Sequence, residues 1–168
     1  SEISRMNGSA HQQAFSCSDI LWQNLLLAEE AWKASNGAFD VTIGPLVKLW
    51  SIKRKRSELP SPEEIEAARQ LVGFDLLTLD REKKTILFKK KGIKVDFGGI
   101  TKGWAVDRVR DLLLSRGIQR GLINLGGNIY SIGQHTTGIR DPADKTLTCT
   151  AVTLNNQGIA TSGNYEQF

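Results

Sequence analysis

A pair of glycines joins a strand-like segment to a helix-like segment near the middle of this 168-residue chain, and this junction constrains the fold most. Val95-Asp96-Phe97 has the apolar alternation of a strand and ends at Gly98-Gly99. A helix is predicted from about Lys102 to Arg116, with Gly117 at its end and one apolar face formed by Ala105, Val109, Leu112 and Leu113. The chain must therefore combine helices with a sheet.

Hydrophobic periodicity and capping residues predict the other elements. Residues 18–36 carry apolar side chains at three- and four-residue spacing before Gly37, which predicts a helix. Ser61-Pro62-Glu63-Glu64 is a capping box that opens a helix to about Val72. A short helix is predicted over 46–50. Strands are predicted over 39–43, 76–79, 85–89, 93–97, 122–125, 128–132, 147–154 and 158–161, so the fold class is α+β with a mainly antiparallel sheet.

Composition and charge exclude several classes of protein. Apolar residues make up 40% and charged residues 24% of the chain, as in globular rather than disordered proteins. No stretch approaches the roughly 20 apolar residues that cross a bilayer. The net charge of +4 gathers in Lys53 to Arg56 and in 81–94. Because no aromatic-interleaved recognition motif accompanies these runs, they indicate solvated turns rather than a nucleic-acid surface, while anionic ligands stay open. Cys17 and Cys149 are expected to be small buried thiols, although a disulfide between them stays open.

The glycine junction carries the strongest candidate site. Gly98 and Gly99 leave bare backbone that a ligand or a metal can approach. The start of the following helix presents free N–H groups and a positive dipole end, which favour phosphate, and Lys102 adds a cation there. Asp96 can accept a hydrogen bond from a ribose or a base edge. A purely structural turn is the alternative, because the segment matches neither a P-loop nor GxGxxG.

Three further segments place polar groups beside glycines, and each has a structural alternative. Asp40 and Thr42 are predicted to point the same way from a strand toward one ligand, whereas Asp40 could equally cap a turn. Gly126-Gly127 either leaves backbone open between two strands or forms a bulge. The segment 161–166 offers hydroxyls and a carboxylate beside glycine, so a serine nucleophile is conceivable. Both histidines, His11 and His135, are expected at the surface, so a Ser-His-Asp site is not favoured. No catalytic residue is assigned.

Taken together, these segments resemble the ApbE family of flavin transferases. The resemblance rests on Ser1 to Arg5 with Asn7, GAFDVTIGPLVKLW (37–50), VDFGGITKGWAVD (95–107), LINLGGNIY (122–130), GIRDP (138–142) and ATSGNYE (160–166). The motifs occur in family order across nearly the whole chain. The resemblance implies a T-fold-related α+β architecture, with residues 1–168 forming part of one such domain.

The resemblance also implies an activity and a ligand set. Family members attach FMN from FAD to a threonine of a target protein, with Mg²⁺ at the pyrophosphate. Ala38, Phe39 and Asp40 match the family's flavin-contacting segment, Asp96, Lys102 and Glu166 match further FAD-side positions, and the carbonyl of Gly99 matches a metal ligand. The implied acceptor is a redox-pump or electron-transfer subunit. The implied location is the periplasm or the outer face of the cytoplasmic membrane, often with a lipid anchor.

Differences from the family pattern leave the function open at this point. The family's His-containing segment and the Asp/Thr segment that supplies side-chain metal ligands would follow Phe168, and its flavin-stacking aromatic residue would precede Ser1. The connection between Gly133 and Gly138 is also short. FAD binding or scavenging without transfer, and FAD hydrolysis by water, are therefore alternatives. We expect these 168 residues alone not to transfer FMN at a useful rate.

Overall fold

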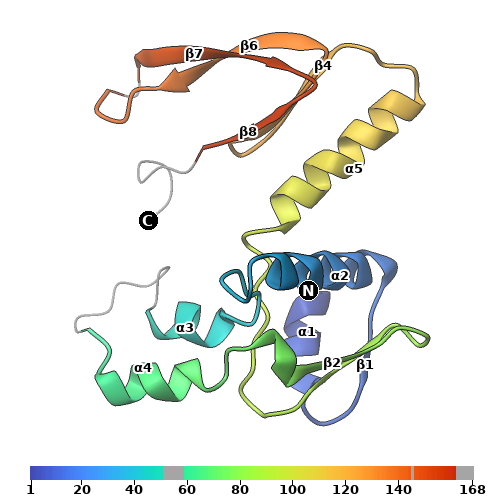
Figure 1. Ribbon diagram of the computed structural model, residues 1–168, viewed down its shortest axis with the longest axis vertical. Coiled ribbons are helices and arrows are strands. Elements are labelled where there is room, and N and C mark those ends of the chain that lie inside the picture. Colours follow the sequence, from blue (N-terminus) through green and yellow to red (C-terminus); the bar gives the residue numbers. More distant parts are fainter. Residues whose placement is uncertain (51–58, 145, 162–168) are drawn as a thin grey trace. The chain divides into compact units, whose positions relative to one another are not determined.

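The computed structural model describes residues 1–50, 59–144 and 146–161, and the chain forms two compact units, Ser1–Ile100 and Thr101–Phe168 (Figure 1). Each unit has its own cluster of buried apolar side chains, and the two clusters share no residue. The basic run Lys53 to Arg56 and the predicted site residue Glu166 lie outside the described residues.

The described helices of the first unit are α1 (Glu2–Ser9), α2 (Asp19–Ala34), α3 (Gly44–Leu49) and α4 (Pro62–Arg69). Three of these four helices, all except α3, begin at a serine cap. The Ser18 hydroxyl accepts a hydrogen bond from Leu21 N at the start of α2, and the predicted capping box between Ser61 and Glu64 is confirmed at the start of α4. The sequence did not predict α1, which is short and polar and buries only Met6.

A three-stranded antiparallel sheet completes the first unit. Its strands are β1 (Phe15–Ser16), β2 (Leu77–Asp80) and β3 (Thr85–Phe88), in the order β1-β3-β2, and the 3₁₀-helix η1 (Phe74–Leu76) leads into β2. Ile86, in the central strand, pairs with Phe15 on one side and Leu79 on the other, and its side chain is completely buried. The predicted strands 76–79 and 85–89 are confirmed.

The core of the first unit extends to the glycine junction. Met6 of α1 and Leu25 of α2 are completely buried in one cluster with Ile86. Ile93, Val95 and Phe97 belong to the same cluster and are at most 4% exposed. The segment that leads into Gly98-Gly99 is therefore anchored in the core, and burial of these apolar side chains stabilises its position.

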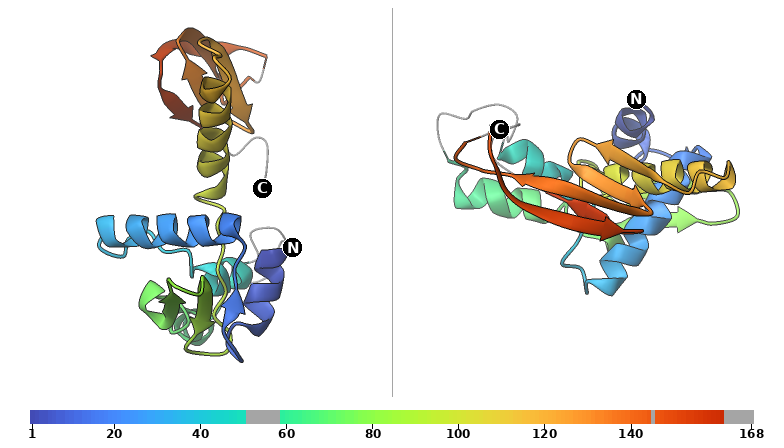
Figure 2. Two further views of the ribbon diagram at one scale, coloured as in Figure 1. Left: turned by 90° about the vertical axis from the view of Figure 1, so that its right-hand side faces the viewer. Right: turned by 90° about the horizontal axis from the view of Figure 1, so that it is seen from above.

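The second unit packs one helix on an antiparallel sheet. It contains α5 (Thr101–Ser115), β4 (Gly121–Leu125), β5 (Asn128–Ile132), β6 (Gln134–Arg140), β7 (Thr148–Asn155) and β8 (Gly158–Ala160). The strands form a sheet of order β4-β5-β8 and a β6-β7 pair. Val106 and Leu113 of α5 meet Ile123, Ile132 and Tyr130, so α5 covers one face of the three-stranded sheet (Figure 2). The fold is the predicted α+β class.

In the second unit the structure decides between two alternatives, corrects one prediction and adds one strand. Gly126 and Gly127, with φ of 56° and 87°, form a two-residue hairpin turn between β4 and β5, not a bulge. The packed face of α5 carries Val106 rather than Val109 and Leu112, which are exposed. The sequence did not predict β6, because its residues alternate without an apolar face.

The two cysteines are free thiols, and only one of them is partly buried. Cys17 is half-buried and Cys149 is exposed, so the expectation of two buried thiols is wrong for Cys149. Burial raises the pKa of the Cys17 thiol to about 11, and the nearby Glu2 carboxylate acts in the same direction. Among the described residues, no helix has the length and apolar content to cross a membrane.

Candidate functional site

A tight turn after α2 presents Ala38 and Phe39 at the edge of the first unit. Asn36 and Gly37 have positive φ of 51° and 81°, and Gly37 N donates to Trp32 O at 2.8 Å. This is the left-handed backbone that glycine adopts without strain. The Ser35 hydroxyl then accepts a hydrogen bond from Phe39 N at 2.9 Å. The end of α2 therefore sets the direction of the segment 38–41.

Residues 39–43 are a turn and not the predicted strand. The Asp40 Oδ1 atom accepts hydrogen bonds from Thr42 N at 2.7 Å and from the Thr42 hydroxyl at 2.6 Å. The Asp40 Oδ2 atom accepts from Phe74 N at 2.8 Å, and the Thr42 hydroxyl oxygen accepts from Gly73 N at 2.7 Å. Local bonds of this kind compete with strand pairing. The alternative in which Asp40 caps a turn is the one that the structure contains.

Residues 93–97 are extended but form no strand, because a side chain takes the place of a neighbouring strand. The Asn7 amide of α1 donates to Val95 O at 2.9 Å and accepts from Val95 N at 2.8 Å. On the opposite side, Asp96 N donates to Val41 O at 2.7 Å and Gly44 N donates to Lys94 O at 3.1 Å. The strand prediction for 93–97 is therefore wrong, and an isolated bridge between Ile43 and Lys94 is what remains of it.

Phe39 and the glycine junction lie against each other. A Cβ atom added at Gly99 would lie 3.1 Å from Phe39 Cε2, so the bare backbone makes room for the ring. Asp96 is exposed, and its Oδ1 atom accepts from Gly98 N at 2.7 Å. Its Oδ2 atom has no hydrogen-bond partner among the described residues. The structure thus brings together an aromatic ring, open backbone and one available carboxylate oxygen.

The other predicted site residues are placed separately. Lys102 is exposed in the first turn of α5, in the second unit, and it has no ion-pair partner within the described part of the chain. The Gly99 carbonyl is a single neutral oxygen, and the described residues contain no group of three His, Cys, Asp or Glu side chains that could hold a metal ion. These residues do not by themselves fit an Mg²⁺ site.

A serine and a histidine meet in the second unit, but not as a nucleophile and a base. The buried Ser131 hydroxyl donates to Gly133 O at 2.7 Å and lies 2.9 Å from His135 Nδ1. Because the hydroxyl has one proton, His135 Nδ1 must donate to the Ser131 oxygen. The pair therefore fixes the turn into β6, and half-buried His135 is not the surface residue that the sequence suggested.

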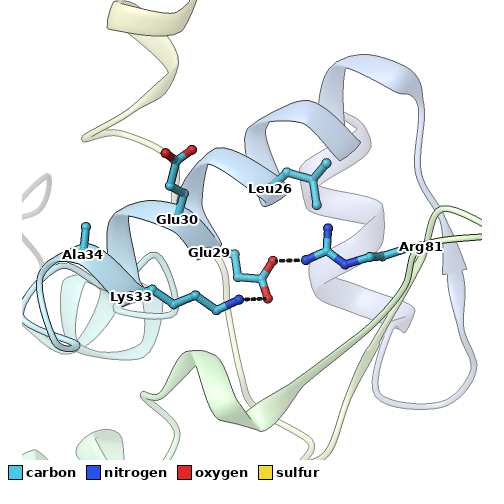
Figure 3. Close-up of a pocket in the computed structure, with 6 residues that line it drawn as sticks. All are labelled: Leu26, Glu29, Glu30, Lys33, Ala34 and Arg81. Carbon is cyan, nitrogen blue, oxygen red and sulfur yellow. Dashed lines mark hydrogen bonds and ion pairs between the residues drawn. The ribbon is translucent and has the colours of Figure 1, made fainter.

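The described surface also has a groove along α2 of about 620 Å³ (Figure 3). Its centre is occupied by Glu29, which contacts Lys33 at 2.9 Å and Arg81 at 2.6 Å, while Glu30 points away. The hydrogen bond from Lys33 is the main cause that lowers the pKa of Glu29. The groove is a satisfied ion-pair network and contains no predicted site residue.

Comparison with known proteins places this arrangement in a family. The sequence model of the ApbE family matches residues 1–168. The chain belongs to the ApbE family. An FAD:protein FMN transferase of Klebsiella pneumoniae is 34% identical over 169 residues, which cover 100% of this chain and 54% of that protein. An enzyme of the same name from Chlamydia muridarum is 34% identical over 99% of this chain and 52% of its own length.

Solved structures of the ApbE family share the fold. The ApbE protein of Thermotoga maritima superimposes with a TM-score of 0.83 at 29% identity, over 98% of this chain and 55% of that one. The flavin transferase ApbE from Vibrio cholerae gives a TM-score of 0.80 at 31% identity, over 100% of this chain and 57% of that one. The chain therefore has the ApbE fold and spans about half the length of these relatives.

Sequence reasoning missed the roles of Asn7 and Thr42. Asn7 belongs to a motif that carries the family resemblance without a predicted role. The prediction that Thr42 points toward a ligand is wrong, because its side chain is completely buried. A polar residue inside an otherwise apolar run such as Val41 to Pro45 was the available signal, because buried hydroxyls need internal partners.

Proposed function

We propose that this chain is the FAD-binding part of an FAD:protein FMN transferase, which moves FMN from FAD to a threonine of an acceptor protein. The observation that carries the proposal is the meeting of Phe39, the Gly98-Gly99 turn and the available Asp96 oxygen at one edge of the first unit. Membership of the ApbE family and the names of the relatives from two organisms support it.

Each site residue has a role that follows from its chemistry. Ala38 and Phe39 offer an apolar surface to the flavin, and the bare backbone at Gly99 permits close approach. The Oδ2 atom of Asp96 accepts a hydrogen bond from a ligand N–H or O–H. Lys102, an exposed cation near the start of a helix, favours the pyrophosphate. Glu166 is carried over from the resemblance alone.

The proposed reaction is a phosphoryl transfer. The threonine oxygen of the acceptor forms a bond to the FMN phosphorus, and the bond from that phosphorus to the AMP oxygen breaks, so AMP leaves with the electron pair. The threonine proton passes to a base that we do not assign. Since the described residues do not fit an Mg²⁺ site, we assign no step to the metal. The expected Mg²⁺ requirement is tested by omitting the ion and adding EDTA.

FAD binding is tested by flavin fluorescence titration of the protein at the length that its gene encodes, which is the parent chain for the variants below. Asp96→Ala should weaken FAD binding about 10- to 100-fold, because a charge-assisted hydrogen bond contributes about 1.5–3 kcal/mol. Asp107→Ala is the matched control, since Asp107 lies on α5 and pairs with Arg110 at 2.8 Å. Equal losses in two folded variants, or no saturable binding by the parent chain, would contradict the proposed site.

Transfer is tested with the protein at the length that its gene encodes. It is mixed with FAD, Mg²⁺ and an acceptor protein that carries a flavinylation threonine, and covalent labelling is read by in-gel flavin fluorescence. Labelling lost on Thr→Val replacement in the acceptor supports the proposal. Release of FMN and AMP without labelling would identify an FAD pyrophosphatase. Binding without either product would identify an FAD-binding or scavenging protein.

The acceptor and the location form the last part of the proposal. We infer an electron-transfer subunit, such as one of a redox pump, as the acceptor, and a location in the periplasm or at the outer face of the cytoplasmic membrane. Both come from the resemblance to the family. An alkaline phosphatase fusion to the gene product tests the location, because that reporter is active only outside the cytoplasm. An inactive fusion would contradict it.

A further inference from the structure

We propose that Thr42 and Asp40 are positioning residues that lock the flavin-facing segment 38–41 onto η1, and that the Asp40 carboxylate is not itself an FAD ligand. The inference rests on the proposed function for the identity of the ligand. It concerns what holds Phe39 at the glycine junction, and it names Thr42, to which neither the family resemblance nor any relative assigns a role.

The hydrogen bonds of the pair form a closed set. Asp40 Oδ1 accepts two hydrogen bonds from Thr42, and Asp40 Oδ2 accepts one from Phe74 N. The Thr42 hydroxyl gives its only proton to Asp40 and accepts from Gly73 N. These four bonds, of 2.6 to 2.8 Å, engage both carboxylate oxygens and the hydroxyl. Three of them fill most of the roughly four acceptor sites of the Asp40 carboxylate, so a ligand could use at most about one site, on Oδ2.

Burial separates positioning from direct contact. Thr42 has no exposed side-chain surface, whereas Ala38 is exposed and Phe39 half-buried. Thr42 therefore cannot touch a bound molecule, and any influence on binding must pass through the segment that precedes it. Asp96 provides the contrast, because it is exposed and has an oxygen without a partner among the described residues.

The 3₁₀-helix η1, to which Asp40 is bonded through Phe74 N, is itself held in place. Phe74 is 5% exposed and stacks on Trp32 of α2 with ring centroids 5.7 Å apart. Trp32 O accepts the hydrogen bond from Gly37 N that begins the turn into Ala38. The segment is thus attached to α2 at its start and to η1 at its end. Between these attachments Phe39 lies against Gly99.

The decisive variant is Thr42→Val, which keeps the shape of the buried side chain and removes the hydroxyl. It breaks the link to Gly73 and one bond to Asp40 without altering any atom that can reach FAD. Thr42→Ser retains the hydroxyl and is the rescue variant. Thr78→Val, at an exposed threonine of β2, is the matched control. Asp40→Asn can keep the bonds to Thr42, but it places an N–H group against Phe74 N.

Two readouts are measured on folded variants. In flavin fluorescence titrations, Thr42→Val and Asp40→Asn should each raise the Kd for FAD about tenfold, which corresponds to about 1.4 kcal/mol. Thr42→Ser and Thr78→Val should stay within about twofold. In the double variant with Thr42→Val and Asp40→Asn, the Kd for FAD should rise by less than the product of the two single increases, because the two residues act as one unit. Without FAD, hydrogen exchange of the amides of residues 38–41 should accelerate in Thr42→Val and not in Thr78→Val.

The outcomes separate the possible roles. A tenfold loss in Asp40→Asn with an unchanged Kd in Thr42→Val would make Asp40 a direct ligand and overturn the proposal. Thr42→Val could instead lower the free energy of unfolding while the Kd for FAD and the hydrogen exchange of residues 38–41 stay unchanged. Thr42 and Asp40 would then be merely structural, and this result would also overturn the proposal. If the parent chain binds no FAD, the proposed function fails, and the exchange measurement alone decides whether Thr42 holds the segment.

Discussion

Replacing Asn7 by Asp removes the side-chain N–H group that donates to Val95 O and keeps the shape of the side chain. The Asn7 amide stands in for a neighbouring strand beside Val95, with bonds of 2.9 and 2.8 Å. The introduced carboxylate can still accept from Val95 N, but it also faces the Val95 carbonyl, and two acceptors repel. The lost bond contributes about 0.5–1.5 kcal/mol, and the unsatisfied carbonyl costs about 1–3 kcal/mol. We therefore expect a loss of about 2–4 kcal/mol at pH 7.

Urea unfolding followed by tryptophan fluorescence measures this loss, because Trp22, Trp32 and Trp50 lie in the first unit. With a dependence of about 2 kcal/mol per molar urea, the midpoint should fall by roughly 1–2 M. Asn7→Ala removes both bonds to Val95 without introducing a charge, so it should also destabilise the chain, by an amount that does not change with pH. Affinity for FAD should fall in both variants, because Asp96 follows Val95 directly.

The pH dependence distinguishes this reasoning from a general loss of packing. Near pH 4 the introduced carboxylic acid is partly protonated and can donate to Val95 O, so the difference between Asn7→Asp and the parent chain should shrink as the pH falls. Asn7→Ala should show no such recovery. A constant difference for Asn7→Asp across pH 4 to 7, or a loss below about 0.5 kcal/mol, would refute the argument that the amide replaces a strand.

Four further outcomes are expected. The Ser18 hydroxyl and backbone N–H lower the pKa of Glu2 below its usual 4.5, so its contribution to stability is present above pH 4.5 and is lost as the pH falls through the folded-state pKa. Glu2→Gln should therefore destabilise at pH 7, and its difference from the parent chain in urea titrations should shrink as the pH falls below 4.5. Asn24→Ala should raise the urea midpoint by an amount equivalent to about 1 kcal/mol, because the buried Asn24 Oδ1 lacks a partner among the described residues. Gly99→Ala should weaken FAD binding more than Gly103→Ala, whose added Cβ meets nothing within 4 Å, and equal effects would argue against contact with Phe39. The 168 residues alone should give no robust covalent labelling of an acceptor, since their described part offers no metal site, and strong in-gel fluorescence would contradict this.

Local signals in the sequence predicted the capped elements correctly. Ser18 and the Ser61 capping box mark helix starts through bonds that reach only three residues along the chain, so they can be recognised in a short window. The same holds for the strands on either side of the turn at Asp80. These elements depend little on what the rest of the chain does.

The wrong strand predictions for 39–43 and 93–97 share a physical cause. The hydrogen bonds that decide these segments join residues far apart in the sequence. Val95 lacks a strand partner because Asn7, 88 residues away, bonds to its backbone. Asp40 leaves the predicted strand because its partner Phe74 lies 34 residues away. Alternation agrees with the burial of Ile93, Val95 and Phe97. It fails over 39–43, where Thr42 is completely buried and Ile43 is exposed, and it cannot tell which group satisfies the backbone.

The separation of the two cores has a calorimetric consequence. Within the described residues, fourteen buried apolar side chains form the first core and three form the second. Units with independent cores need not melt together, so the heat absorbed on warming should divide between two transitions, and one melting temperature would not describe the chain. A ligand raises only the transition of the unit that binds it. The thermogram recorded with FAD would then assign the binding energy to Ser1–Ile100, to Thr101–Phe168, or to both together.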